Sequence, residues 1–327
     1  MDIGVVGISR SSATFADRER VARACRAEGF AFSLGSCVPL TTCNRTEFYF
    51  SSPRLREAYE HILYVFEKEV KGFPPRSLYA RFGKACFLHL SRVVSGMESH
   101  VFGESDIQRQ VKVAYETVRK ERVLASELHY LFQKGLKIGK EMRSMILPRE
   151  ACLPDALRAL IGTPGAERKR FLFIGNSAIN RSMIFHLLRR GLFDITLCTR
   201  TGKRPFRSVT TVGWQEGRRW FAYDVVVAAT YHEKYVIAED SEKRGGRVML
   251  FDLGMPRNID PSLSTRAGLS LYGIDDVLRS ARCARKENDP DVTVCNEAVE
   301  RLTERQMTLF MAKKERRAPA LGCTGLA

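Results

Sequence analysis

The sequence predicts an α/β protein, and three observations support this fold class. The chain has 327 residues, 44% of them hydrophobic, which is enough for two domains of ordinary size. In the first half, strand-like alternation mixes with longer helical patterns, which indicates an α+β domain. In the second half, short apolar runs alternate with helical patterns, which is typical of a parallel sheet. We therefore expect domains over residues 1–148 and 149–282, followed by a C-terminal helical region over residues 283–327.

The composition limits the classes of partner and compartment. Lys and Arg total 53 against 37 acidic residues, giving a net charge of +16, which favours a polyanionic partner. Residues 76–149 contribute 14 Lys or Arg against 7 Asp or Glu. The 9 cysteines are odd in number and form no Cys-x-x-Cys pair, so we expect reduced thiols in a cytoplasm and no metal site. No apolar run reaches the roughly 18 residues of a membrane span, and the first residues do not resemble an export signal, so no membrane association is expected.

The first elements surround a turn at Cys43. Residues 3–8 predict a strand and residues 18–28 a helix. An apolar run over residues 38–40 enters the turn, and an alternating run over residues 47–50 leaves it, with its two phenylalanines on one face. The side chain of Cys43 is thus expected at a sharp turn between two extended segments.

The rest of the first domain is predicted to be mainly helical. Pro53 opens a helix that the Gly-Pro segment over residues 72–75 ends, and residues 78–80 form a short strand. Helical patterns follow from Ala85 onward. Two apolar stripes, which we interpret as core, consist of Ile107, Val111, Ala114, Tyr115 and Val118, and of Leu128, Leu131, Phe132, Leu136 and Met142.

The second domain has the pattern of a dinucleotide-binding fold. After a link over residues 148–164, a strand over residues 171–174 runs into a turn that opens a helix, where a dinucleotide pyrophosphate would lie. The turn consists of Gly175, Asn176, Ser177, Ala178, Ile179 and Asn180. Only its first residue keeps the glycine of the usual fingerprint, because Ser177 and Asn180 occupy the other two glycine positions. Further apolar runs at residues 225–229 and 248–251 extend the parallel sheet of a Rossmann-like domain.

The second strand of this domain is predicted over residues 194–198, and Arg200 follows its end. Where an NAD enzyme carries an acidic residue for the ribose diol, an arginine can accept the 2′-phosphate of NADP. The position of Arg200 therefore predicts an NADP preference, with Thr201 and Lys203 as assisting residues.

The last region is charged and helical. A thin apolar stripe of Val294, Ala298, Leu302 and Leu309 precedes a basic cluster. Two such stripes would bury little apolar surface, and the basic clusters would repel one another. We therefore expect a monomer or a weak homodimer.

The turn around Cys43 offers chemistry as well as geometry. A thiolate is a nucleophile, and neighbouring positive charge lowers the pKa of a thiol. Arg45 can supply that charge or hold a substrate carboxylate bidentately. A lone loop cysteine is more often inert, so the turn by itself leaves catalysis open.

Several segments together extend this signal along the chain. They are residues 7–14, 17–20, 41–47, 87–99, 103–112, 131–140, 252–261 and 271–276. In this order they resemble glutamyl-tRNA reductase. The resemblance implies an N-terminal catalytic domain that recognises glutamyl-tRNA, an NADPH-binding domain and a truncated dimerisation region.

The resemblance also implies a reaction. In this family, a cysteine attacks the ester of L-glutamyl-tRNA(Glu), and NADPH reduces the resulting thioester to glutamate-1-semialdehyde. This is the first step of tRNA-dependent 5-aminolevulinate and porphyrin or haem biosynthesis. Cys43 matches the nucleophile and His89 a functional histidine, while the partner implied for product transfer is glutamate-1-semialdehyde aminomutase.

The family's substrate contacts transfer to matching positions. They are Thr42, Asn44, Arg45, Ser99, Glu104, Ser105, Asp106 and Gln110. The family usually has Glu-Pro-Gln at residues 104–106, so Asp106 replaces an amide with a carboxylate. That carboxylate would repel a glutamate carboxylate in direct contact.

Two alternatives belong to other functional classes. A tRNA-binding regulatory protein with little reductase activity is favoured by the missing glycines and opposed by Cys43 and His89. A thiol-dependent dehydrogenase of a free small aldehyde would need no tRNA.

Overall fold

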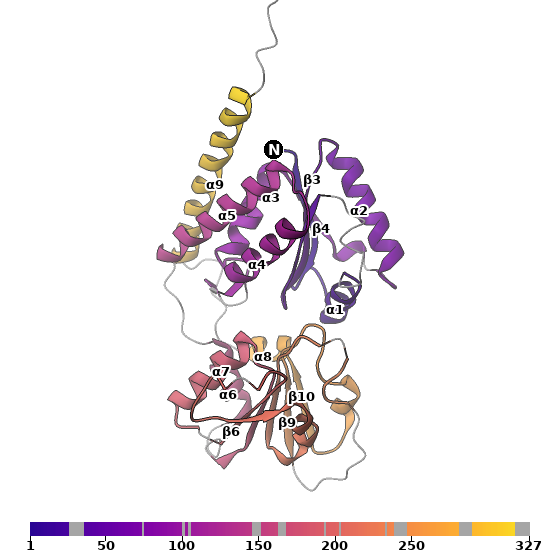
Figure 1. Ribbon diagram of the computed structural model, residues 1–327, viewed down its shortest axis with the longest axis vertical. Coiled ribbons are helices and arrows are strands. Elements are labelled where there is room, and N and C mark those ends of the chain that lie inside the picture. The colour runs from indigo at the N-terminus through magenta and orange to yellow at the C-terminus, as the bar shows by residue number, and fades with distance from the viewer. Residues whose placement is uncertain are drawn as a thin grey trace, which may run out of the picture. The chain divides into compact units, whose positions relative to one another are not determined.

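The computed structural model divides into two compact units. Unit 1 comprises Met1–Pro148 with Arg285–Ala327, and unit 2 comprises Arg149–Ala284 (Figure 1). The residues that the structure describes are 1–25, 36–73, 75–99, 102–103, 106–145, 152–162, 168–192, 194–202, 204–232, 234–238, 247–280 and 290–317.

Unit 1 contains a four-stranded antiparallel sheet in the order β2-β3-β1-β4. Its strands are β1 (Ile3–Ser9), β2 (Cys37–Thr41), β3 (Arg45–Ser51) and β4 (Tyr79–Phe82). On β3, Phe48 and Phe50 pack into one core, while Tyr49 packs into the other. The predicted alternation along this strand is therefore confirmed.

Helices cover both faces of this sheet (Figure 1). The Phe48 face packs against α1 (Phe15–Ala24) and α2 (Leu55–Glu69). Helix α1 begins three residues before the predicted start, because the hydroxyl of Thr14 caps it by accepting the amide of Asp17 at 3.2 Å. Part of the predicted helix, residues 26–28, lies outside the described residues.

The opposite face of the sheet packs against a larger helical layer. Its members are α3 (Gly83–Val94), α4 (Asp106–Glu121), α5 (Ser126–Met145) and α9 (Pro290–Arg317). Both predicted stripes of α4 and α5 face this core, although Ala114 and Leu136 are only partly buried. A short 3₁₀ turn, η1 (Pro75–Ser77), precedes β4.

The apolar face predicted for α9 is wrong at two positions. Val294 and Leu309 are exposed, whereas the buried side chains are Cys295, Ala298, Val299, Thr303 and Phe310. The buried set follows the helical repeat along the face that meets α3 and α5. On that face, the Thr303 hydroxyl donates to the Ser91 hydroxyl at 3.2 Å.

This packing bears on self-association. The apolar face of α9 is already covered by α3 and α5, and its last turns carry Lys313, Lys314 and Arg316, which repel their copies across a symmetric contact. We expect light scattering at micromolar concentration to show a monomer or a weak homodimer. A dimer that is insensitive to salt and persists on dilution would contradict this expectation.

Unit 2 contains a six-stranded parallel sheet in the order β10-β9-β8-β5-β6-β7. Its strands are β5 (Phe171–Ile174), β6 (Ile195–Thr199), β7 (Thr210–Gly213), β8 (Val225–Ala228), β9 (Val248–Asp252) and β10 (Leu269–Gly273). This order is that of the Rossmann fold, which confirms the predicted class. Hydrophobic runs had not identified the edge strands β7 and β10, which are only partly buried.

Helices and 3₁₀ segments flank this sheet (Figure 1). They are α6 (Cys152–Ile161), α7 (Ala178–Arg189), α8 (Ile274–Ser280), η3 (Trp214–Ala222) and η4 (Pro261–Thr265). Helix α6 corrects the prediction of a plain link over residues 148–164. Pro154 lies in its first turn, where a missing backbone donor is tolerated, and Leu157 is fully buried. Among the described helices, none has the length and apolar character needed to cross a membrane.

Candidate active site

Cys43 and Asn44 form the tip of the hairpin between β2 and β3. The amide of Thr42 donates to the carbonyl of Arg45 at 2.8 Å, which closes the turn. The hydroxyl of Thr42 also accepts the amides of Asn44 and Arg45, each at 3.2 Å. The hydroxyl of Thr42, a predicted substrate contact, thus stabilises the turn itself. Cys43, at the tip of this turn, is half-buried.

Arg18 braces this turn from α1. Its guanidinium is 1% exposed and donates to the carbonyl of Cys43 at 2.7 Å. The sequence reasoning assigned no role to Arg18. The available signal was its spacing from Val21 and Ala22, which places a cation on the buried face of an amphipathic helix. Buried charges need partners, so an inward-facing arginine indicates a specific polar contact.

Glu47 is the centre of a buried polar cluster next to the turn. Its side chain is fully buried. Oε1 lies 2.9 Å from Nη1 of Arg45 and 2.8 Å from Nε2 of His89. The hydroxyl of Tyr49 donates to Oε2 at 2.6 Å, and that of Tyr79 donates to Oε1. Both oxygens of the carboxylate are therefore satisfied by donors.

The charges in this cluster stabilise one another. Burial alone would raise the pKa of Glu47, but the Arg45 guanidinium, His89 and the hydrogen bonds of the cluster hold this pKa well below its usual value. Burial and the carboxylate together raise the pKa of Tyr79 and Tyr49, which remain neutral donors. Because an ionised carboxylate only accepts hydrogen bonds, Nε2 of His89 must carry a proton. In the neutral ring, Nδ1 is then the nitrogen that accepts.

A cavity of about 690 Å³ adjoins this cluster in unit 1. It brings together four predicted site residues, namely Asn44, Arg45, His89 and Ser99. Cys43 is not among the lining residues, although it precedes Asn44 in the turn. Sequence reasoning had not assigned roles to the other polar residues of the lining, which are Ser9, Arg10, Ser11, Ser12, Tyr79, Arg81 and Glu98.

Arg45 has less freedom than its predicted role assumed. Its Nη1 is bonded to Glu47, and its Nη2 donates to the carbonyl of Glu98 at 2.6 Å. Only Nε, which is buried, has no hydrogen-bond partner among the described residues. The protein thus already uses two of the five N–H groups of Arg45, and these bonds hold the guanidinium in place beside the cavity that it lines.

The remaining predicted substrate contacts lie elsewhere or are not described. Asp106 and Gln110 are on α4, where Nε2 of Gln110 donates to Asp106 at 2.7 Å, and Arg109 also bonds to this carboxylate. Neither residue lines the cavity. Glu104 and Ser105 lie outside the described residues.

His89 gives a first test of this site. We expect His89→Ala to retain measurable but reduced turnover, lower by about 10²–10⁴-fold, the usual contribution of a positioned proton-transfer group. The measurement is steady-state turnover alongside a thermal melt. Phe82, the last residue of β4 and 40% exposed, provides the control Phe82→Ala. Full activity in His89→Ala would remove the imidazole from the mechanism.

In unit 2, the turn after β5 has the conformation that a dinucleotide site needs. Gly175 has φ +98°, and a Cβ there would lie 2.7 Å from Cβ of Thr230 and 2.8 Å from the carbonyl oxygen of Ala229. Glycine is therefore required at this position. The next loop of the sheet approaches the turn closely, as at the first glycine of the usual fingerprint.

The two positions that lack glycine are used differently. Ser177 caps α7 by accepting the amide of Asn180 at 3.1 Å. Asn180 is fully buried, and its amide group donates to the carbonyls of Ile174 and Gly175 at 3.0 and 2.7 Å. These contacts hold the turn in shape without the other two glycines. Asn176 accepts from Arg181, and Ala178 and Ile179 form the first turn of α7.

The neighbouring loops are tied into the same edge of the sheet. Asp252 accepts the amides of Gly254, Asn258 and Ile259. Burial raises the pKa of this carboxyl group to about 6, while these amides oppose the shift. The side chain of Asn258 in turn bonds to both backbone groups of Thr230. These hydrogen bonds join the loops at the carboxyl ends of β8 and β9, the edge of the sheet at which dinucleotides bind in this fold.

The residues present fit a pyridine nucleotide. Gly175 permits the tight turn after β5, and the N-terminus of the 12-residue helix α7 follows this turn, which suits a pyrophosphate. Arg200 follows β6 as predicted, and Thr201 is exposed, whereas Lys203 lies outside the described residues. Within the described ranges, no group of three or more potential metal ligands occurs.

Comparisons with known proteins agree with both units. Residues 6–146 match the family model of the glutamyl-tRNAGlu reductase N-terminal domain, and residues 159–280 match that of shikimate/quinate 5-dehydrogenase. Fold and matches together define an oxidoreductase that uses a pyridine nucleotide.

Similar full-length proteins narrow this class. Glutamyl-tRNA reductase of Chlamydia pneumoniae is 33% identical over 79% of this chain and 78% of its own. That of Rubrobacter xylanophilus is 31% identical over 85% of this chain and 70% of its own. A solved glutamyl-tRNA reductase from Methanopyrus kandleri aligns over 96% of this chain and 81% of its own, at 24% identity and a TM-score of 0.47. The chain belongs to the glutamyl-tRNA reductase family, which confirms the resemblance.

Proposed function

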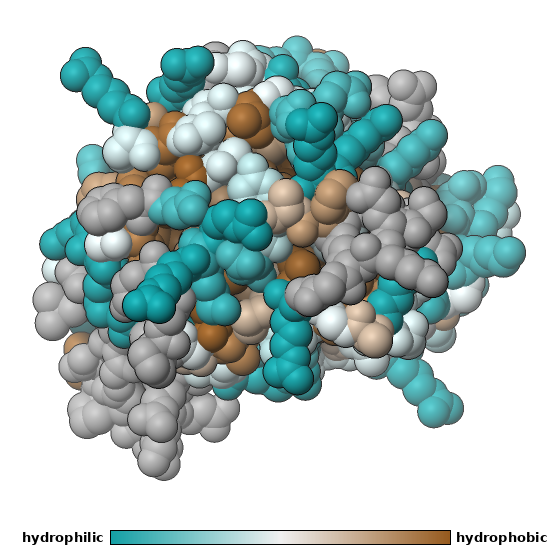
Figure 2. Space-filling view, turned by 90° about the horizontal axis from the view of Figure 1, so that it is seen from below, coloured by the Kyte–Doolittle hydropathy of each residue, from teal (hydrophilic) through white to brown (hydrophobic). Residues whose placement is uncertain are grey.

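We propose that the protein reduces L-glutamyl-tRNA(Glu) to glutamate-1-semialdehyde with NADPH, through a thioester on Cys43. This would be the first step of tRNA-dependent 5-aminolevulinate and porphyrin or haem biosynthesis. The observation that carries the proposal is the braced Cys43 turn beside a cavity lined by Asn44, Arg45 and His89, in a member of this family. The net charge of +16 supports an RNA substrate, and hydrophilic side chains project over the face shown in Figure 2.

The first chemical step uses this chain's own thiol. The sulfur of Cys43 attacks the ester carbonyl carbon, a C–S bond forms, and the C–O bond to the 3′-terminal ribose breaks. The thiol proton ends on the ribose oxygen, so tRNA leaves as an alcohol. Nδ1 of His89 is the acceptor we assign to this proton transfer, because Glu47 holds the other nitrogen. Arg45, which lines the cavity, would bind a substrate carboxylate.

The second step needs the cofactor. NADPH, when bound, would supply the hydride that converts the thioester into an aldehyde, and the C–S bond then breaks so that Cys43 is returned as a thiolate. The Gly175 turn and the N-terminus of α7 would hold its pyrophosphate. The aldehyde would then pass to glutamate-1-semialdehyde aminomutase in the cytoplasm, as the family resemblance implies.

Transfer of label distinguishes this function from its alternatives. With labelled glutamyl-tRNA and no NADPH, we expect label to co-migrate with denatured protein and to be released as semialdehyde when NADPH is added. Binding of tRNA without covalent label would favour the regulatory protein. Reduction of free aldehyde without any use of charged tRNA would favour the small-aldehyde dehydrogenase.

Arg200 gives a test of the cofactor. We expect Arg200→Ala to weaken the binding of NADPH more than the binding of NADH. The reason is that a charge-assisted hydrogen bond, here to the 2′-phosphate, contributes about 1.5–3 kcal/mol. The measurement is the KM of each cofactor. Arg189→Ala, on the exposed side of α7, is the matched control. Equal losses for NADPH and NADH would place the 2′-phosphate elsewhere.

A further inference from the structure

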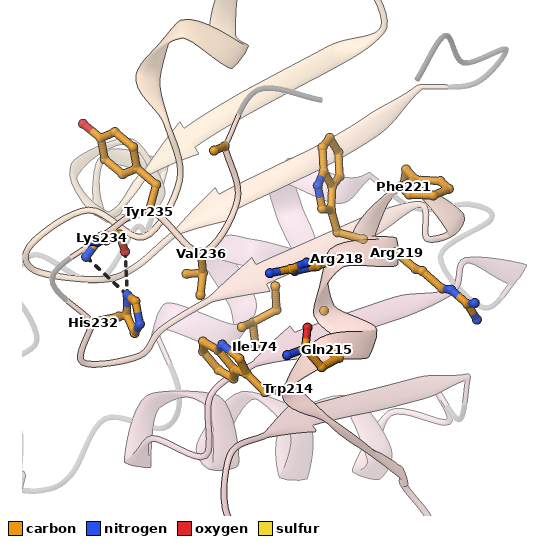
Figure 3. Close-up of a pocket in the computed structure, with 13 residues that line it drawn as sticks. Ile174, Trp214, Gln215, Arg218, Arg219, Phe221, His232, Lys234, Tyr235 and Val236 are labelled. Atoms are coloured by element: carbon orange, nitrogen blue, oxygen red, sulfur yellow. Dashed lines mark hydrogen bonds between the residues drawn. The ribbon is translucent and has the colours of Figure 1, made fainter. Parts of the chain in front are cut away.

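Unit 2 contains a cavity of about 660 Å³ at the carboxyl end of β5, where Ile174 is part of its lining. Figure 3 shows Trp214 and Arg218, which come from η3, and His232, Lys234 and Tyr235, which come from the loop after β8. None of the lining residues is acidic. Aromatic rings with basic side chains and no carboxylate suit a phosphorylated nucleoside.

Arg200 lies beside this cavity rather than in its lining. Its guanidinium carbon is 5.4 Å from the centre of the Trp214 ring, and its Nη2 donates to the carbonyl of Tyr231 at 3.0 Å. The ring of Trp214 also contacts that of His232, with centroids 5.9 Å apart. The guanidinium is thus held by a cavity-lining ring and by the residue before His232.

Both members of this stack are anchored to the end of β6. The buried thiol of Cys198 donates to the carbonyl of Gly213, the residue before Trp214, at 3.4 Å. Burial raises the pKa of this thiol to about 11, so it remains a donor at neutral pH. The hydroxyl of Thr199 accepts the amide of Gly202 at 3.0 Å and fixes the turn that carries Arg200.

We propose that Trp214 is a positioning residue for Arg200, and that the Trp214–Arg200 stack sets the preference for a dinucleotide with a 2′-phosphate. The adenosine half of that dinucleotide would occupy the adjacent cavity. A stacked guanidinium keeps its edge N–H groups available, and one of them is already oriented by Tyr231. Because the side chain is ordered before binding, less conformational entropy is lost when phosphate binds. This inference rests on the proposed use of NADPH.

Calorimetric titration with two fragments tests the inference without turnover. Adenosine 2′,5′-bisphosphate carries the 2′-phosphate, and 5′-AMP lacks it. We expect Trp214→Leu to lose about tenfold more affinity for the bisphosphate than for 5′-AMP, because the lost cation–π contact acts at the 2′-phosphate, whereas a lost contact of the ring with adenosine affects both fragments alike. Trp214→Phe, which keeps a weaker ring, should show a smaller difference of about two- to fivefold between the fragments.

Phe185→Leu is the matched control. It removes another arginine–aromatic pair of unit 2, in which the guanidinium of Arg189 lies 5.9 Å from the ring of Phe185 on α7. This control should bind both fragments as the wild type does. If Trp214→Leu does not fold, Trp214→Phe decides the question.

Two outcomes would overturn the positioning role of Trp214, and a third would overturn the proposed function. Equal losses for both fragments would overturn the positioning role, because Trp214 would then act on adenosine or on folding. Unchanged affinity for the bisphosphate in both Trp214 variants would overturn it as well. Wild-type protein that binds neither fragment nor NADPH would instead overturn the proposed function on which the inference rests.

Discussion

Cys43→Ser is expected to abolish semialdehyde formation while leaving the fold intact. A hydroxyl is nearly isosteric with a thiol, but it is a far poorer nucleophile at neutral pH. The turn should survive, because hydrogen bonds of the backbone, of Thr42 and of Arg18 hold it. The measurements are turnover with glutamyl-tRNA and covalent labelling by glutamate, and both should fall to background.

A second thiol in unit 1 supplies the control for this prediction. Cys25, at the end of α1, is half-buried like Cys43. Cys25→Ser should therefore keep wild-type labelling and turnover. Near wild-type turnover in Cys43→Ser would exclude the thioester route.

Glu47→Gln is expected to have the largest effect on stability. Four side chains donate to the Glu47 carboxylate. An amide presents its own N–H groups to some of those donors and leaves Arg45 buried without a counter-charge. Breaking a buried ion pair on one side costs about 3–5 kcal/mol. Urea unfolding at pH 7 should show this loss, and turnover should fall with it because His89 loses its orienting partner.

The acid dependence of unfolding gives the same prediction a second readout. The folded-state pKa of Glu47 is held below the ordinary value of 4.5. Its stabilising contribution is therefore complete above that pH and is lost as pH falls from there toward the folded pKa. The difference in unfolding free energy between wild type and Glu47→Gln should narrow below about pH 4.5.

An exposed glutamate provides the control. Glu57 on α2 pairs with Arg54 at the surface, so Glu57→Gln should change stability by less than about 1 kcal/mol. A similar stability for wild type and Glu47→Gln at pH 7 would show that the buried cluster is not a stabilising network.

The parts of the fold that follow from hydrophobic periodicity could be predicted from sequence. The two faces of β3 and the central strands of the unit 2 sheet are such cases, because each buries a continuous or alternating apolar pattern. Helix α6 was missed because Pro154 and the neighbouring prolines are typical of a link. The buried face of α9 was misplaced because several stripes are possible on a helix that carries apolar residues on more than one side.

The polar parts of the site were harder to predict, for a physical reason. Arg18 and Glu47 are charged residues that are almost completely buried, against the usual preference of their types. Their burial is compensated by partners from the β2–β3 turn, β3, β4 and α3. A single sequence contains no direct record of which residues meet across those elements. The family resemblance named Cys43 and His89, but not the cluster that orients the imidazole.

Unit 1 is built from two separate chain segments, and this has a consequence for synthesis. Cys295, Ala298 and Val299 of α9 belong to the same core as α3 and α5, although the whole of unit 2 lies between them in the chain. During synthesis, the residues of unit 2 are made before those of α9. Until α9 is made, the part of the unit 1 core that packs against it stays exposed. A released chain that is truncated before residue 290 should therefore contain a protease-resistant second unit and a protease-sensitive first unit.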